Sequence, residues 1–181
     1  LPGKGKVHKA YPWVLVGGDT HRPSCIIYRF YLTRKHAHAK EMIRDFQGNL
    51  HSDKYGAYQA LAEKGVITWT PCWMHIRRKF FEAKSGDQAF RERILEQIRE
   101  LFIWERLAWQ CTDERRLEIR QSKELPIIES ITHDCRKKLE ENILLPKSKL
   151  LAAISYFFGL EPYVRNYVFD PYARIDNGVA E

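Results

Sequence analysis

Strand-like and helix-like segments alternate along the first half of the chain, and this alternation limits the fold more than any other feature. Runs rich in β-branched and aromatic residues predict strands at 13–16, 25–32, 49–52 and 66–70. The helical spacing of apolar residues predicts helices between them, at 37–46 and 55–64. The order strand, strand, helix, strand, helix, strand is typical of an α/β domain.

The second half carries helical patterns instead. Apolar residues recur every three or four positions, which predicts helices at 72–83, 90–109, 126–139 and 147–158. Pro126 suits the first turn of a helix, and Gly159 suits a helix end. The segment 113–120 is so densely charged that we expect a solvated helix there. We therefore expect one α/β domain that carries a large α-helical insertion.

Length and composition exclude several classes of protein. A chain of 181 residues can bury the core of one domain without a disulfide or metal. The longest apolar runs are far shorter than the ~20 residues that a membrane helix needs, and we expect no secretory leader. A cytoplasmic location with four reduced cysteines follows as the expectation. The formal charge of +7 is compatible with a nucleic-acid partner.

Asp53 is the first residue that could carry chemistry. It follows the predicted strand at 49–52, so its carboxylate would project from a rigid sheet edge and could hold a hard divalent cation. The alternative is an N-cap for the helix that begins near Tyr55, because aspartate is favoured at that position. Spacing alone favours the N-cap.

Cys72 and His75 are the second candidate. They lie three positions apart on a predicted helix, so they share a face and could supply half of a zinc site. His133 and Cys135 form another close pair, but their spacing is not diagnostic. A buried cysteine beside a hydrogen-bonded histidine is the favoured interpretation.

Basic residues form the third candidate group. Arg77, Arg78 and Lys79 are consecutive, and Lys54 follows Asp53 directly. Such side chains could neutralise DNA phosphates, in an attraction that is independent of sequence and sensitive to salt. The alternative is an ordinary solvated face, since acidic residues interleave from Glu82 onward.

The segment 175–181 reads IDNGVAE. Asp-Asn-Gly is typical of a turn or a helix start, which would place Glu181 in the first turn of a helix. A glutamate there also interacts favourably with the helix macrodipole, so a structural role is the alternative.

Several blocks taken together resemble the bacterial transposases of the insertion-sequence-66 family, which have a DDE catalytic core. In the family's order, the blocks are LPGKGK, WVLV, IIYRFYLTR, HAKEMIRDFQG, LHSDKYGAY, CWMHIRRKFFEA, LPKSKLLAAISYF and IDNGVAE. The resemblance implies an RNase H-like mixed sheet with helices. In that fold, three carboxylates from separate elements converge on two divalent cations, Mg²⁺ or Mn²⁺. The resemblance also favours Asp53 as a metal ligand over Asp53 as an N-cap.

By this resemblance, Asp53 is the second catalytic Asp and Glu181 the catalytic Glu, and both are metal ligands. Cys72 and His75 match a signature between these two carboxylates, for which a local structural role without zinc is expected. The implied organisation is an RNase H-like core at 1–83, a helical insertion at 84–170 and a return to the core at 171–181 with the Glu motif.

The family's first catalytic Asp lies on a strand before the Pro-Gly-Lys-Gly-Lys segment, and residues 1–181 offer no counterpart. Asp19 is no substitute, because it matches a turn between strands. We therefore expect an excerpt or a truncated gene product that is inactive alone.

The implied function is metal-dependent DNA cleavage and strand transfer, with transposon ends and target DNA as partners, a homo-oligomer as a possibility and no membrane. One alternative is another RNase H-like nuclease, such as a resolvase, which cuts branched DNA without strand transfer. A further alternative is a non-catalytic remnant that binds DNA or dimerises. Metal-dependent cleavage by a version extended at both ends would separate the enzymes from the remnant.

Overall fold

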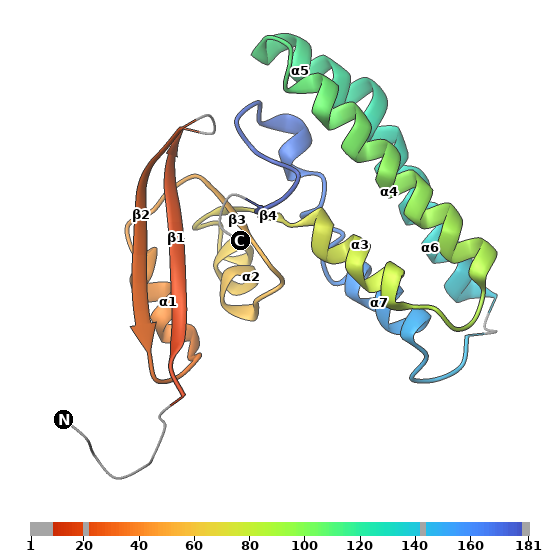
Figure 1. The fold of residues 1–181 in the computed structure, drawn as a ribbon, viewed down its shortest axis with the longest axis horizontal. Helices are drawn as coiled ribbons and strands as arrows, with labels where there is room; N and C mark the ends of the chain where they lie inside the picture. The colour runs from red at the N-terminus through yellow and green to blue at the C-terminus, as the bar shows by residue number, and fades with distance from the viewer. Residues whose placement is uncertain (1–8, 20–21, 142–143, 179–181) are drawn as a thin grey trace.

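The computed structural model describes residues 9–19, 22–141 and 144–178 (Figure 1). Its elements are β1 (Tyr11–Asp19), β2 (Arg22–Tyr31), α1 (His36–Met42), β3 (Asn49–Ser52), α2 (Gly56–Glu63), β4 (Thr68–Pro71), α3 (Trp73–Glu82), α4 (Gln88–Ala108), α5 (Asp113–Ile119), the π-helix η1 (Arg120–Glu124), α6 (Leu125–Glu140), α7 (Lys149–Phe158) and the 3₁₀-helix η2 (Asn166–Phe169). The hairpin β1–β2 lies on one side of the molecule and the long helices α4 and α6 on the other, with α3 and α7 between them (Figure 1). The expected mixed α/β class is confirmed.

Strands β1 and β2 form an antiparallel sheet, in which Tyr11 pairs with Tyr31. Gly17 and Gly18 lie within β1, and the register of the pairing shifts between them. Gly18 has a φ of 123°, which side-chain-bearing residues rarely adopt, and this conformation permits the bulge. On the inner face of the hairpin, the ring of Trp13 meets the ring of Tyr55 at 5.5 Å between centroids. This contact holds the hairpin against the start of α2.

Strands β3 and β4 form a separate parallel pair, from Asn49 opposite Thr68 to Ser52 opposite Pro71. Helix α2 connects them. Because parallel strands end at the same edge, the residues that follow each strand are neighbours: the amide of Cys72 donates to the carbonyl of Ser52 at 3.2 Å. This shared edge positions the candidate site.

One continuous set of buried apolar side chains joins the parallel strands to the helices. Trp69 of β4 and Trp73 of α3 are fully buried where the sheet meets the helical layer. Further fully buried members come from four helices: Ile76, Phe80, Ile94, Ile98, Leu101, Ile128, Ile131, Ile154 and Phe157. The buried core is therefore continuous from the parallel strands through α3 and α7 to α4 and α6.

The charged segment 113–120 is not a solvated helix, and that prediction is wrong. Arg116 is 2% exposed and Arg120 is fully buried, because both reach carbonyl groups of a segment much later in the chain. Elements α5, η1 and α6 follow one another without a break, as one helix with a widened turn at Arg120–Glu124.

Pro126 explains the widened turn. A proline inside a helix has no N–H, and its ring clashes with the carbonyl four residues earlier. Here the amide of Leu125 bonds the carbonyl of Arg120, five residues back, as in a π-helix. The wider turn moves the backbone away from the proline ring, so the helix continues.

Within the described ranges, no helix is both long and apolar enough to cross a membrane.

Candidate active site

Asp53 stands at the carboxyl end of β3, with its side chain 53% exposed. Its Oδ1 atom accepts a hydrogen bond from Asn177 Nδ2 at 3.1 Å. His75 Nδ1, from the first turn of α3, lies 3.0 Å from the same oxygen. Three segments that are far apart in sequence therefore meet at one carboxylate.

The alternative role of Asp53 as an N-cap does not match this geometry. Helix α2 begins at Gly56, its N-cap is Tyr55, and no side chain bonds its first amides. The Asp53 carboxylate instead faces α3 and the end of the chain. Its position beyond the strand leaves the carboxylate about half exposed, where it can take a ligand.

Cys72 and His75 occupy the start of α3, next to Asp53. Cys72 is 3% exposed, and burial raises the pKa of its thiol more than the nearby amides of Asn177, His75 and Met74 lower it. The side chain of His75 is 15% exposed and is directed at Asp53. Among the described residues, no three His, Cys, Asp or Glu side chains are grouped to hold a metal ion.

Glu181 lies outside the described residues, so its distance from Asp53 stays a prediction. The residues just before it do reach the site: Asn177 contacts Asp53, and Asp176 Oδ1 accepts from the amide of Gly178 at 2.9 Å. Asp176 thus shapes the turn that leads toward Glu181.

Residues 164–178, here called the return segment, run from the helical layer back to the strand edge. Five of its hydrogen bonds reach the sheet and α3, namely Asn166 Nδ2 to Trp69 O (2.7 Å), Asn49 Nδ2 to Asp170 Oδ2 (3.1 Å), the Arg174 amide to His51 Nε2 (3.3 Å), the Trp73 amide to Ile175 O (3.0 Å) and Trp73 Nε1 to Val164 O (3.1 Å). The position of Asn177 therefore depends on the whole segment.

His51 takes part in this attachment as a neutral ring. Burial lowers its pKa to about 4. The nearby Asp170 carboxylate raises the pKa, but by less than burial lowers it. At neutral pH, Nε2 is therefore unprotonated and can accept a hydrogen bond from the amide of Arg174.

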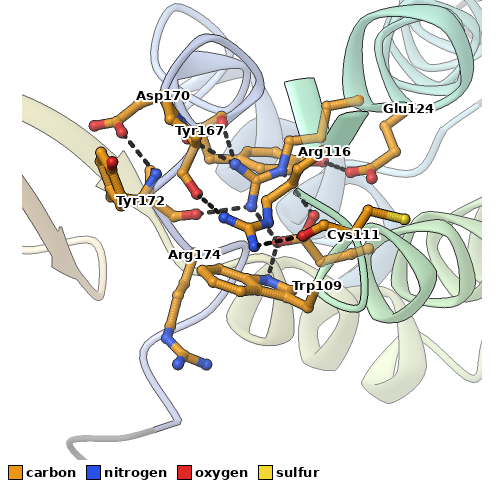
Figure 2. Close-up of polar contacts among 12 residues, drawn as sticks. Trp109, Cys111, Arg116, Glu124, Tyr167, Asp170, Tyr172 and Arg174 are labelled. Atoms are coloured by element: carbon orange, nitrogen blue, oxygen red, sulfur yellow. Dashed lines mark hydrogen bonds and ion pairs between the residues drawn. The ribbon is translucent and has the colours of Figure 1, made fainter. Parts of the chain in front are cut away.

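The other end of the return segment is held by a buried arginine. The Arg120 guanidinium pairs with both oxygens of Glu105, at 2.9 and 2.6 Å. Its remaining N–H groups donate to three backbone carbonyls of the return segment, those of Tyr167 (2.9 Å), Asp170 (2.6 Å) and Ala173 (2.8 Å). A guanidinium has five N–H donors, and all are used here. We call Glu105, Arg120, Glu124 and Tyr167 the arginine cluster, of which Figure 2 labels Glu124 and Tyr167.

Glu124 is the second acid of the arginine cluster. Burial first, and the Glu105 carboxylate second, raise its pKa to about 8, although its bond from the Tyr167 hydroxyl at 2.7 Å acts the other way. Glu124 is therefore mostly neutral at pH 7. The cluster then contains one close pair of opposite charges, Arg120 with Glu105.

Trp109 adds a second attachment beside the arginine cluster. The guanidinium carbons of Arg116 and Arg174 lie 4.0 and 4.8 Å from its ring centroid. Arg116 also donates to the carbonyl of Pro171 at 2.8 Å (Figure 2). The helical layer thus fixes the return segment at several points before it reaches Asp53.

The basic residues divide into two groups. Lys54 and Lys79 place their ammonium groups 5.1 and 5.4 Å from the ring centroid of Tyr156 in α7. Lys54 also donates to the Tyr156 carbonyl at 3.5 Å, and burial lowers its pKa. Arg77 and Arg78 line a cavity beside Asn177 instead. Contact of these residues with DNA stays a prediction.

The fold and the site define a mixed α/β protein with a carboxylate exposed at a sheet edge and with an added helical layer. Residues 1–181 match the family described as "Transposase IS66 family". The chain belongs to this family, as the sequence motifs predict.

Two relatives come from Sinorhizobium fredii (strain NBRC 101917 / NGR234). The uncharacterized protein y4qI is 30% identical over 200 residues, which cover 99% of this chain and 35% of the relative. The uncharacterized protein y4hP is 30% identical over 181 residues, which cover 91% of this chain and 32% of the relative. The chain thus spans about a third of the length of these curated relatives. No solved structure matches.

Proposed function

We propose that this chain is part of a DDE transposase catalytic core, in which Asp53 and Glu181 supply two of three carboxylates for metal-dependent DNA cleavage and strand transfer. The observation that carries the proposal is the bond from Asn177 to Asp53. It joins a strand-edge carboxylate to the segment that leads to Glu181, across 124 positions of sequence. Membership of a transposase family supports the same role.

An RNase H-like core is part of this proposal. Among the described residues, β1 pairs with β2 alone and β3 with β4 alone, so β1 and β3 each have one unpaired edge. A further strand between β1 and β3 would join the two small sheets into one mixed sheet. The family's first catalytic Asp belongs on such a strand, and residues 1–181 offer no counterpart to it.

A divalent cation fits Asp53 only in part. Asn177 and His75 both engage Oδ1, and the side chain is 53% exposed, so the carboxylate stays accessible as a hard oxygen ligand. The described residues do not complete a donor set, so the proposed site also needs Glu181 and the first Asp. When bound, the cations would stabilise the attacking and leaving oxygens of a phosphoryl transfer. Asn177 and His75 would fix the direction of the Asp53 carboxylate.

DNA would approach along α3, where Arg78 and Lys79 are exposed. Replacing Arg77, Arg78 and Lys79 together with Ala should weaken duplex binding equally for all sequences. It should also flatten the dependence of log K on log salt by about 0.9 for each lost phosphate contact. A slope unchanged by the triple substitution would remove these residues from the DNA surface.

The test of catalysis uses a protein extended at both ends to include the strand with the first Asp. This protein should cleave DNA that carries the element's ends in the presence of Mn²⁺, and Asp53→Asn should abolish cleavage. Asp45→Asn is the matched control, because Asp45 is exposed and remote from the strand edge. The 181-residue chain should not cleave. If the chain alone cleaves and Asp53→Asn abolishes that activity, the requirement for the first Asp is wrong.

Strand transfer distinguishes a transposase from a resolvase-like nuclease. A transposase should join the freed 3′ ends to a target plasmid. A resolvase should cut branched substrates and give no joined product.

A non-catalytic dimerisation role has one observation in its favour. Alternate residues of β2 expose large apolar side chains on one face: Ile26 (53%), Tyr28 (61%) and Phe30 (71%). Exposed apolar strands of this kind mark interaction surfaces. If the extended protein dimerises and does not cleave, this second function replaces the first.

A further inference from the structure

Helix α3 has two distinct faces. Three side chains on its inner face are fully buried: Trp73, Ile76 and Phe80. Four side chains on its outer face follow the spacing i, i+3, i+4, i+7 and line a cavity: Met74, Arg77, Arg78 and Phe81. The inner face anchors the helix, so the outer face is held rigidly toward solvent.

The cavity has a volume of about 440 Å³. Phe102 of α4 forms another part of its wall, and residues 176–178 of the return segment close it beside Cys72. Asn177 lines this cavity and also donates to Asp53, so the cavity and the candidate active site are adjacent. A volume near the lower end of the range for small-ligand sites admits one nucleotide-sized group.

The lining combines apolar surface with two arginines and one carboxylate, that of Asp176, whose Oδ1 accepts a hydrogen bond from the amide of Gly178. Met74 is 41% exposed and Phe81 is 50% exposed, so both offer apolar surface to a ligand. The Arg77 guanidinium lies 5.8 Å from the ring centroid of Phe81. Arg78 is exposed at the same cavity. Aromatic faces suit nucleobases, and arginine forks suit phosphates, so the two kinds of side chain together match one nucleotide.

We propose that this cavity binds one unpaired nucleotide next to the phosphodiester at Asp53. Its base would lie against Met74, Phe81 and Phe102, and its phosphate would face Arg77 and Arg78. This inference rests on the proposed function, because it assigns the cavity to the same DNA substrate. A base inside a duplex cannot reach a lateral cavity, so the nucleotide that enters must leave the stack.

The test compares two DNA probes that differ by one nucleotide. One is a fully paired duplex, and the other is the same duplex with a single unpaired nucleotide at its centre. Fluorescence anisotropy at low salt, with Mg²⁺, should give a Kd about tenfold lower for the unpaired probe. Phe81→Ala and Met74→Ala should each bring the two Kd values together. Phe81→Trp should keep the preference, since it retains an aromatic face.

Phe46→Ala is the matched control, because Phe46 is an exposed aromatic residue after α1 that does not line this cavity. This variant should keep the tenfold preference. A 5-iododeoxyuridine at the unpaired position should photocrosslink to Met74 or Phe81. Equal affinities for the two probes, a preference that survives Phe81→Ala, or crosslinks that map to β2 would each overturn the inference.

The extended protein separates this inference from the proposed function. If it cleaves DNA in an Asp53-dependent way but binds both probes equally, the cavity assignment fails and the catalytic proposal stands. If it prefers the unpaired probe but never cleaves, the catalytic proposal fails. A preference shown by the 181-residue chain and lost in the extended protein also overturns the inference, because the added residues would then fill the cavity.

Discussion

The strand edge at Asp53 and the arginine cluster both gather polar groups from distant parts of the chain, yet they are built in opposite ways. Asp53 is about half exposed, and its contacts with Asn177 and His75 fall on one oxygen. Arg120 is fully buried, and all of its donors are used. An open oxygen can take a ligand, whereas an unpaired charge in the interior would destabilise the fold. The Asp53 carboxylate is thus built to bind a ligand, and the Arg120 guanidinium is built to stabilise the fold.

The largest effect on stability is expected for Arg120→Ala. This change leaves Glu105 buried without its cation and leaves three carbonyls without donors, so it should cost about 3–5 kcal/mol of unfolding free energy. Urea denaturation measures the loss. Arg99→Ala is the control, because Arg99 pairs with Glu96 on the open surface of α4 and should change stability little. Equal losses in the two variants would contradict the assigned role of Arg120.

Glu124 should make stability fall as pH rises. Its pKa is raised by folding to about 8 from an ordinary 4.5, so the folded state holds a proton that the unfolded state has released between these values. The stabilising contribution is complete below about pH 4.5 and is lost as pH rises through about 8, with a slope of up to about 1.4 kcal/mol per pH unit. Below about pH 6.5 the lowered pKa of His51 adds a slope of opposite sign, so denaturation between pH 6.5 and 9 should show the Glu124 slope.

Glu124→Gln tests the assignment of that slope. Glutamine stays neutral and can still accept a hydrogen bond from the Tyr167 hydroxyl. The variant should therefore lose the part of the pH dependence of stability that Glu124 contributes. Glu129→Gln, at an exposed position of α6, is a suitable control. A slope that is identical in the wild type and Glu124→Gln would place its origin elsewhere.

Asn177→Ala should have a smaller effect on stability, about 0.5–1.5 kcal/mol for one hydrogen bond at a partly exposed site. In the extended protein it should also raise the Mn²⁺ concentration needed for cleavage, because the Asp53 carboxylate loses one fixed contact. Asn177→Asp would place a like charge at Asp53 and should be worse than Asn177→Ala. Full activity in both variants would mean that Asn177 does not orient Asp53.

The smallest stability effect is expected for Asp53→Asn, within about 0.5 kcal/mol of zero. The asparagine Oδ1 can still accept from Asn177, and the site is open to solvent. Cleavage by the extended protein should nevertheless disappear. If Asp53→Asn unfolds the protein, Asp53 is needed for the fold, and its contrast with the arginine cluster is wrong.

The sequence predicts the strand edge well. The strand at 49–52 and the helices on either side of β4 have the expected order, and their bounds differ from the predicted ones by about one or two residues. The pattern alone nevertheless favours Asp53 as an N-cap, because aspartate is favoured at that position and a helix is expected to begin near Tyr55. The family motifs correct this, since they depend on the order of several blocks and not on one helix boundary.

The arginine cluster is not predicted, because its charged residues resemble a solvated face in sequence. Their partners are remote: Glu105 lies 15 positions from Arg120, and the three carbonyls lie 47 to 53 positions away. One local signal exists. Buried residues at Arg116, Arg120, Glu124 and Ile128 follow steps of four, which would drift by about 40° a step around a regular α-helix. A widened turn before Pro126 reduces that drift.

The 124 positions between Asp53 and Asn177 also set the order in which the strand edge is completed during synthesis. At ~5–20 residues per second, the ribosome reaches Asn177 roughly 6–25 s after it has added Asp53. Until then, the carboxylate has neither Asn177 nor the return segment beside it. In a nascent chain, the strand edge therefore lacks the return segment. The candidate site is complete only after the helical layer has been synthesised and the return segment has packed against the strand edge.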